Sequence, residues 1–234
     1  SPDGKRLVFS AMNRLYAMDL PGGAPRLLTS APQGSGATEG EFMPTWSPDG
    51  RFIAYTTWTT TGGHIKRVAA GGGAAETLTR FEGYYLDPTY TPDGSKVVYL
   101  AGAAADQLYS IMMDIQPEDD RTEDEAPREI TGIDAPNTLE IRWMPAGGGA
   151  PALVASAQGG RAPHFSRNDS SRIYLAGRRG LQSIDIGGLD RRTLFRIQGS
   201  GPGNNPPSAD EIRLSPDGTR AFVNLQGKHF LVPV

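Results

Sequence analysis

A four-residue turn, Ser-Pro-Asp-Gly, recurs along the chain and constrains the fold more than any other feature. Its intact copies begin at Ser1, Ser47, Thr91 and Ser215, with Thr replacing Ser in the third. Proline presets the second position of a tight turn, and Asp and Gly tolerate the conformations that follow. Apolar residues stand directly before the three internal copies, namely Trp46, Tyr90 and Leu214. The pattern predicts a strand, a tight turn and a second strand, repeated.

The spacing of the turn predicts the architecture. The second copy begins 46 residues after the first, and the third begins 44 residues after the second. Periods of about 40–50 residues are typical of propeller blades, each a four-stranded antiparallel sheet. A degraded copy at 166–169 is followed 49 residues later by Ser215. It lies 75 residues after Thr91, so this unit carries an insertion of roughly 30 residues.

Each unit is expected to contain strands a to d in chain order. Strand a precedes the turn, and strand b follows it at 6–10, 52–56, 96–100, 172–176 and 220–224. Glycine clusters mark the hairpin between strands c and d, because glycine supplies the positive φ of tight hairpin loops. The predicted c strands are 14–20, 64–69, 140–144 and 181–186. The predicted d strands are 26–29, 76–79, 152–155 and 192–195.

The sequence thus predicts an all-β fold, a propeller of four-stranded antiparallel blades with about five repeat units. The expected units are 1–41, 42–85, 86–160, 161–207 and 208–234, in one domain. Strand a is missing from the first unit and strand d from the last. The chain also begins without Met and without a signal sequence. We therefore expect a mature or cut piece of a longer protein, with a ring incomplete at both ends.

Composition and motifs argue against several functional classes. The net charge of −3 gives no general affinity for nucleic acid, and without cysteine there are no thiolate metal sites. No apolar run approaches the roughly 20 residues that span a bilayer. The three histidines, His64, His164 and His229, form no zinc-binding motif, and Gly-x-Ser-x-Gly and Walker motifs are absent. We expect neither a catalytic site, a cofactor nor a metal site within the chain.

An acidic insertion is predicted at 101–139. Between residues 114 and 129 there are eight acidic residues and two arginines, which gives this segment a charge of −6. Clustered carboxylates suit calcium, but the segment lacks the glycine and the spacing of an EF-hand loop. We expect a solvated loop here.

A candidate binding surface follows from the register of the a strands. Thr45, Thr89, His164 and Arg213 occupy equivalent positions. Because strand a is innermost in a propeller, these side chains are expected to line the central channel. The nearby charged residues are Glu41, Asp87, Arg161 and Glu211. The alternative is that these groups only satisfy neighbouring backbone atoms. We expect Trp46, Tyr90 and Phe165 to pack between blades.

The repeat resembles that of TolB-type propellers. The resemblance lies in Pro-Thr-Trp-Ser-Pro-Asp-Gly-Arg-Phe-Ile-Ala-Tyr at 44–55 and Gly-Gly-x-x-x-x-Leu-Thr at 72–79, and it covers nearly the whole chain except 101–139. Such repeats occur in TolB, in prolyl-oligopeptidase-like and tricorn-like proteases, and before metal-dependent amidohydrolases. The stretches 140–146, 159–165, 172–175 and 208–218 are most similar to the last group. In that group a propeller packs with an amidohydrolase barrel that carries the metal-binding histidines, and no position here matches them.

The resemblance implies a non-catalytic propeller of a periplasmic or secreted bacterial amidohydrolase-like protein. It would shape access to a linked or associated hydrolase domain outside this chain, where zinc or a similar divalent metal would bind. The alternatives are a free-standing TolB-like module that binds a protein or peptide, and the propeller of a prolyl-oligopeptidase-like protease.

Overall fold

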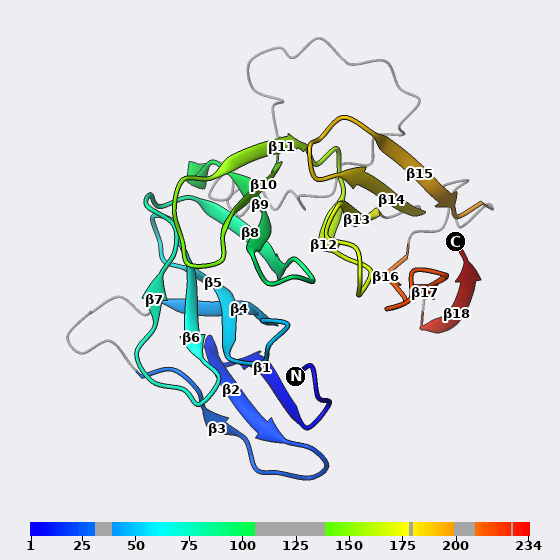
Figure 1. The fold of residues 1–234 in the computed structure, drawn as a ribbon. Coiled ribbons are helices and arrows are strands. Elements are labelled where there is room, and N and C mark those ends of the chain that lie inside the picture. Colours follow the sequence, from blue (N-terminus) through cyan, green and yellow to red (C-terminus); the bar gives the residue numbers. More distant parts are fainter. Residues whose placement is uncertain (31–38, 106–138, 178–179, 199–208, 226) are drawn as a thin grey trace.

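The computed structural model describes residues 1–30, 39–105, 139–177, 180–198, 209–225 and 227–234. In this part of the chain, strands β1 to β18 form three four-stranded and two three-stranded antiparallel sheets. The sheets follow one another in chain order around a common centre, as the blades of a propeller do (Figure 1). The predicted all-β propeller is confirmed.

Each blade is built from consecutive strands. The first contains β1 (Arg6–Ala11), β2 (Arg14–Asp19) and β3 (Arg26–Leu27). The second contains β4 (Gly40–Trp46), β5 (Phe52–Trp58), β6 (Ile65–Ala69) and β7 (Glu76–Thr77). The third contains β8 (Tyr84–Tyr90), β9 (Lys96–Gly102), β10 (Glu140–Pro145) and β11 (Ala152–Ser156). The fourth contains β12 (Arg161–His164), β13 (Arg172–Gly177), β14 (Gly180–Asp185) and β15 (Arg191–Arg196). The fifth contains β16 (Glu211–Leu214), β17 (Arg220–Leu225) and β18 (Lys228–Pro233).

The predicted strands b, c and d are all present, with ends that differ by one or two residues. The acidic insertion joins β9 to β10, which pair directly, so it interrupts the third blade between its second and third strands. Residues 101 and 102, predicted to begin the insertion, belong to β9. Residues 106–138 lie outside the described part of the chain, and so does the acidic stretch 114–129.

Each intact copy of the turn is held by the same set of hydrogen bonds. In the second blade, the Ser47 amide donates to the Phe52 carbonyl at 2.9 Å, and the Phe52 amide donates to the Ser47 hydroxyl oxygen at 2.9 Å. The Asp49 carboxylate accepts from the Ser47 hydroxyl at 2.6 Å and from the Arg51 amide at 3.0 Å. Gly50 adopts φ 71°, a value that L side chains rarely adopt. The turn therefore fixes the register of the two strands it joins.

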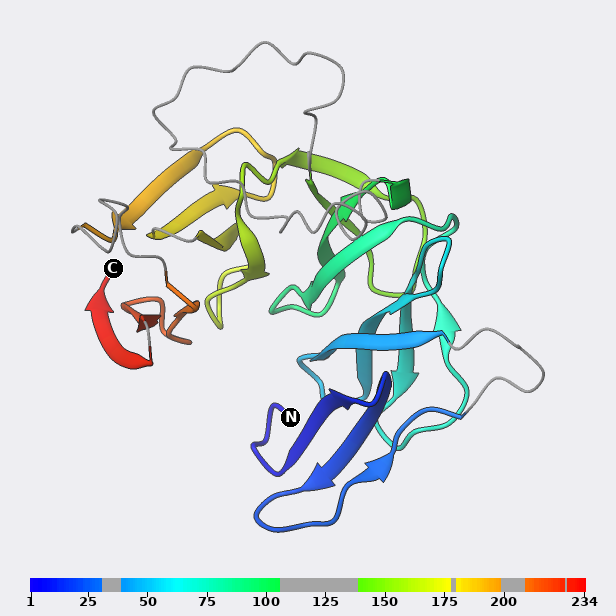
Figure 2. The same cartoon turned by 180° about the vertical axis from the view of Figure 1, so that it is seen from behind.

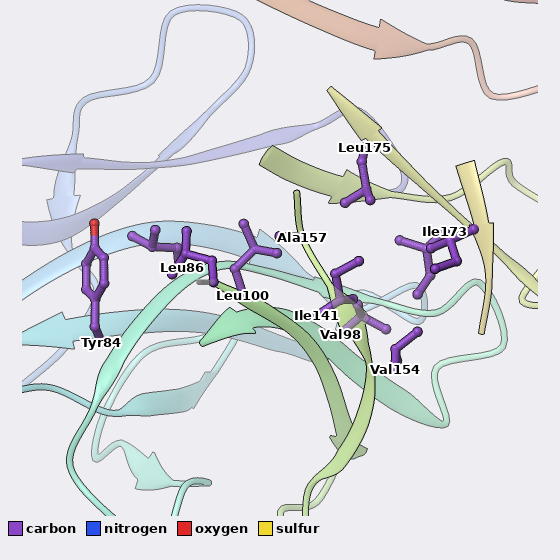
Figure 3. Close-up of a cluster of buried hydrophobic side chains, with 11 residues drawn as sticks. Tyr84, Leu86, Val98, Leu100, Ile141, Val154, Ala157, Ile173 and Leu175 are labelled. Atoms are coloured by element: carbon purple, nitrogen blue, oxygen red, sulfur yellow. The ribbon is translucent and has the colours of Figure 1, made fainter. Parts of the chain in front are cut away.

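Burial between blades supplies the core. Four clusters of buried apolar side chains lie at the four junctions between consecutive blades. Figure 3 shows the junction of the third and fourth blades, where Val98 and Ile141 meet Ile173 and Leu175. As predicted, Tyr90 belongs to the second-to-third junction, while Trp46 and Phe165 pack against neighbouring clusters. Each blade is thus stabilised by the blades beside it.

The turn aspartates give the fold a pH dependence. Hydrogen bonds from Ser47 and from Arg51 lower the pKa of Asp49 to about 2. Because this pKa lies below the ordinary value of 3.8, the turn contributes stability above pH 3.8, and the contribution is lost as pH falls towards 2. We predict that Asp49→Asn lowers the melting temperature more at pH 7 than at pH 2, as measured by circular dichroism.

Asp19→Asn is the matched control, because Asp19 is exposed at the end of β2 and its ion-pair partner Arg26 is 4.0 Å away. It removes one negative charge without touching a Ser-Pro-Asp-Gly turn. An equal effect of Asp49→Asn at both pH values would contradict the assignment to the turn hydrogen bonds.

Candidate functional site

Strands β4, β8, β12 and β16 are the innermost strands of their blades. They lie nearest the common centre in both views of the molecule (Figures 1 and 2). The four residues predicted to share one register, Thr45, Thr89, His164 and Arg213, all belong to these strands. The structure therefore places them at the inner ends of four consecutive blades.

Three of the inner strands carry the same β-bulge. Pairing with the neighbouring strand shifts between Phe42 and Thr45 in β4, between Leu86 and Thr89 in β8, and between Arg161 and His164 in β12. The bulged residues have left-handed backbones, with φ of 52° at Met43, 48° at Asp87 and 47° at Ala162. A proline follows each of them: Pro44, Pro88 and Pro163. Left-handed conformations of this kind cost free energy in non-glycine residues.

The sequence analysis missed these bulges, although a signal was available. Proline cannot donate a ladder hydrogen bond, so within sheets it is confined to edges, strand starts and bulges. The recurring X-Pro-Thr or X-Pro-His before the turns of the second, third and fourth units is such a signal.

Side chains of one blade satisfy backbone donors of the next along the inner strands. The Asp87 amide donates to Sδ of Met43 at 3.3 Å, and the Ala162 amide donates to Oδ2 of Asp87 at 2.9 Å. The Leu214 amide donates to Nε2 of His164 at 2.9 Å. We call these three hydrogen bonds the inner belt. They link the second blade to the third, the third to the fourth and the fourth to the fifth.

His164 is held on both ring nitrogens. Nε2 accepts from Leu214, so Nδ1 carries the proton and donates to the Ala162 carbonyl at 2.8 Å. Burial lowers the pKa of His164 to about 4, and the Arg213 charge acts in the same direction. His164 therefore forms hydrogen bonds with backbone groups of β12 and β16. This agrees with the alternative that these polar residues satisfy neighbouring backbone atoms.

Glu41 belongs to a contact between the first two blades. Its Oε2 accepts from the Leu15 amide at 2.9 Å, from the Thr29 hydroxyl at 2.7 Å and from Nε of Arg14 at 3.3 Å. Its side chain is almost fully buried. The carboxylate thus ties β4 to β2 and to the segment that follows β3.

The remaining charged residues are more accessible. Arg213 and Glu211 form an ion pair at 3.2 Å, with about half of each side chain exposed. Burial raises the pKa of Tyr84, and the nearby charge of Arg161 opposes this shift. Asp87, Arg161, Thr45 and Thr89 are half-buried. We call this set of polar residues the inner surface; it consists of Thr45, Asp87, Thr89, Arg161, Glu211 and Arg213.

The other histidines lie away from the inner strands. Nδ1 of His64 is 3.0 Å from the Thr79 hydroxyl, and His229 packs against Phe222 with ring centroids 5.3 Å apart. Within the described ranges, no three His, Asp or Glu side chains are grouped so that they could hold a metal ion. The same ranges contain no helix of the length and apolarity needed to cross a bilayer.

Comparison of sequences identifies a relative over part of the chain. No family model matches the chain. An uncharacterized protein of Agrobacterium fabrum is 34% identical over 107 residues, which is 43% of this chain and 34% of that protein. The chain thus spans about a third of the length of this relative.

Solved structures match over most of the chain. Putative TolB from Agrobacterium tumefaciens has a TM-score of 0.60 at 19% identity, covering 95% of this chain and 66% of that one. TolB from Acinetobacter baumannii has a TM-score of 0.57 at 17% identity, covering 100% of this chain and 52% of that one. A puromycin-hydrolyzing peptidase from Mycobacterium tuberculosis has a TM-score of 0.56 at 17% identity, covering 97% and 36%. The fold is therefore a TolB-like β-propeller, similar also to the propeller of a peptidase.

Protonation of His164 is expected to weaken the junction of the fourth and fifth blades. Its folded pKa of about 4 lies below 6.5, so the neutral ring contributes stability above pH 6.5 that is lost as pH falls towards 4. The difference corresponds to at most about 3 kcal/mol of unfolding free energy. We predict that His164→Ala lowers this free energy at pH 7.5 and flattens its pH dependence between 6.5 and 4, measured by urea denaturation.

His229→Ala is the control, because His229 is an exposed histidine on the last strand. It should retain the wild-type pH dependence that comes from His164. An NMR titration of His164 with a midpoint near 6.5 would refute the proposed role of its ring.

Proposed function

We propose that residues 1–234 act as a non-catalytic binding propeller, and that the inner surface receives a protein or peptide. The three bulges on neighbouring inner strands carry this proposal. Bulges re-aim side chains and are over-represented beside functional sites, and strained backbones persist where the surroundings hold them in place. Here they recur at Met43, Asp87 and Ala162.

The inner surface has the chemistry of a polar recognition site. It offers carboxylates and guanidinium groups from two neighbouring blade junctions, and the Glu211–Arg213 pair is half-exposed. Charged groups at such a surface give orientation and specificity to an incoming segment. The strands hold the backbone of these residues in place, so binding has to order only their side chains.

We propose further that this propeller belongs to a periplasmic or secreted amidohydrolase-like protein. In that setting it would scaffold and gate access to a metal-dependent hydrolase domain, linked or associated, outside this chain. Support comes from the sequence resemblance at 140–146 and 208–218. In addition, Nδ1 of His64 is within hydrogen-bond distance of Thr79 and both ring nitrogens of His164 are hydrogen-bonded to backbone atoms, so these nitrogens already have partners within the propeller. Any zinc-like ion would then be bound by that domain.

Two other contexts are supported by particular similarities. The alternative of a free-standing TolB-like module that binds a protein or peptide is supported by the fold shared with the TolB structures. The peptidase structure favours the propeller of a prolyl-oligopeptidase-like protease. A His-x-His motif in the reading frame downstream of Val234 would support the amidohydrolase context, and a stop codon there would support the free-standing module.

Binding at the inner surface can be tested with a matched pair of arginines. Peptides selected from a random 12-residue display library on the wild-type chain serve as the probe. We predict that Arg213→Ala weakens their affinity by about tenfold or more, because it removes a charged contact. Arg192→Ala should leave affinity within about twofold. Arg192 also pairs with an acid two residues earlier, Asp190, but lies on the outer strand β15. Equal affinities for both variants, or no selected binders, would count against this surface.

The absence of catalysis is a separate expectation. We predict that the purified chain does not hydrolyse amide or ester substrates with or without added Zn²⁺, because the residues assigned here bind backbone or neighbouring side chains. The measurement is release of a chromophoric leaving group, compared with a heat-denatured sample. Metal-dependent turnover that survives further purification would overturn the non-catalytic assignment and leave the peptide test unaffected.

A further inference from the structure

The inner belt contains one link of a different chemistry from the others. The acceptor at the junction of the second and third blades is the thioether of Met43, whereas the later links use the Asp87 carboxylate and the His164 imidazole. A thioether is a weak hydrogen-bond acceptor, and it is the only one of these groups open to two-electron oxidation by peroxide.

Met43 is partly open to solvent. The residue is 41% exposed, although it lies on an inner strand beside a buried network around Glu41. Met43 lies at the β-bulge, where the pairing of β4 with β5 shifts between Phe42 and Thr45. Two other methionines give a scale within the same chain, because Met12 is 88% exposed and Met144 only 1% exposed.

We propose that Met43 is a site of reversible oxidation, and that its sulfoxide breaks the link between the second and third blades. The oxidant is a peroxide. A lone pair of Sδ attacks the terminal peroxide oxygen, an S–O bond forms and the O–O bond breaks. The sulfur loses two electrons, and the departing oxygen takes up a proton and leaves as water or an alcohol.

The geometry explains why this change would matter. The Asp87 amide nitrogen lies 3.3 Å from Sδ, and an N–H···O bond alone requires about 2.9 Å between nitrogen and oxygen. Oxidation gives the sulfur a partial positive charge, so the sulfur no longer accepts a hydrogen bond from the Asp87 amide. The added oxygen cannot lie on the line between the two atoms while the strands stay in place, and it accepts from this amide only if the Met43 side chain turns. We therefore expect the Asp87 amide to be released.

The consequence extends to the next blade through the same residue. The Asp87 carboxylate accepts a hydrogen bond from the Ala162 amide, and the Asp87 amide donates one to Met43. Its left-handed backbone, φ 48°, is maintained by contacts on both sides. Oxidation at Met43 would thus loosen a residue that joins three blades and belongs to the inner surface.

The test combines mass spectrometry with amide hydrogen exchange on the 234-residue chain treated with hydrogen peroxide. Peptide mapping should show a 16 Da gain at Met12 and at Met43, and none at Met144 over the same period. Exchange of the Asp87 amide, followed by NMR, should accelerate by about fivefold, the fold-change expected for loss of one hydrogen bond. Treatment with methionine sulfoxide reductases should restore the slow exchange.

Two substitutions distinguish Met43 from general oxidation. Met12→Leu removes the most exposed methionine of the described part, and the Asp87 response to peroxide should persist. Met43→Leu should abolish that response, whatever its effect on the starting exchange rate. Should Met43→Leu impair folding, Met43→Gln provides a second replacement that peroxide does not oxidise, and its Asp87 amide should not respond to peroxide. The proposal is overturned if Met43 is not oxidised before Met144, or if the oxidised chain keeps a slow Asp87 amide.

Discussion

Each blade of this protein depends on its neighbours, because a single small sheet cannot bury its own two faces. The four buried clusters all lie between consecutive blades, and residues such as Ile53, Tyr99 and Ile141 are removed from water only by side chains of another blade or another strand of the same sheet. Stability therefore accumulates junction by junction, as in other repeat proteins. Because the cores between the blades are alike, we expect any binding site to depend on side chains that differ from one blade to the next.

The parts of the structure that sequence could predict are those set by local chemistry. A serine, a proline, an aspartate and a glycine in order close one turn through bonds that span five residues, so they act alike wherever they occur. The paired strands follow from the turn, and the aromatic residue before it falls at a junction, as with Tyr90. Even the degraded fourth copy keeps an aspartate, Asp169, that accepts from the Ser171 amide at 2.8 Å.

The candidate site was less accessible to sequence reasoning, because equivalent positions acquire different partners. Register placed His164 and Arg213 correctly on inner strands, but it could not reveal that His164 reaches the Leu214 amide, 50 residues away. Nor could it separate Glu41 from the accessible charges, since the Glu41 carboxylate is hydrogen-bonded to Arg14 and Thr29 of the preceding blade. These contacts join residues of different blades. They depend on how the blades pack in space, which the repeated sequence pattern does not specify.

The side chains of the inner belt are occupied by backbone amides, and only Asp87 belongs both to the belt and to the inner surface. An innermost strand exposes unpaired amides, which would invite pairing with another chain unless side chains cover them. Met43, Asp87 and His164 do so, and a histidine whose two nitrogens are occupied has nothing left to offer a ligand. Asp87 keeps a second carboxylate oxygen, and Arg213 keeps a half-exposed guanidinium. Recognition is therefore expected to use the groups that the inner belt leaves open, which are the second carboxylate oxygen of Asp87 beside its bulge and the Arg213 side chain on β16.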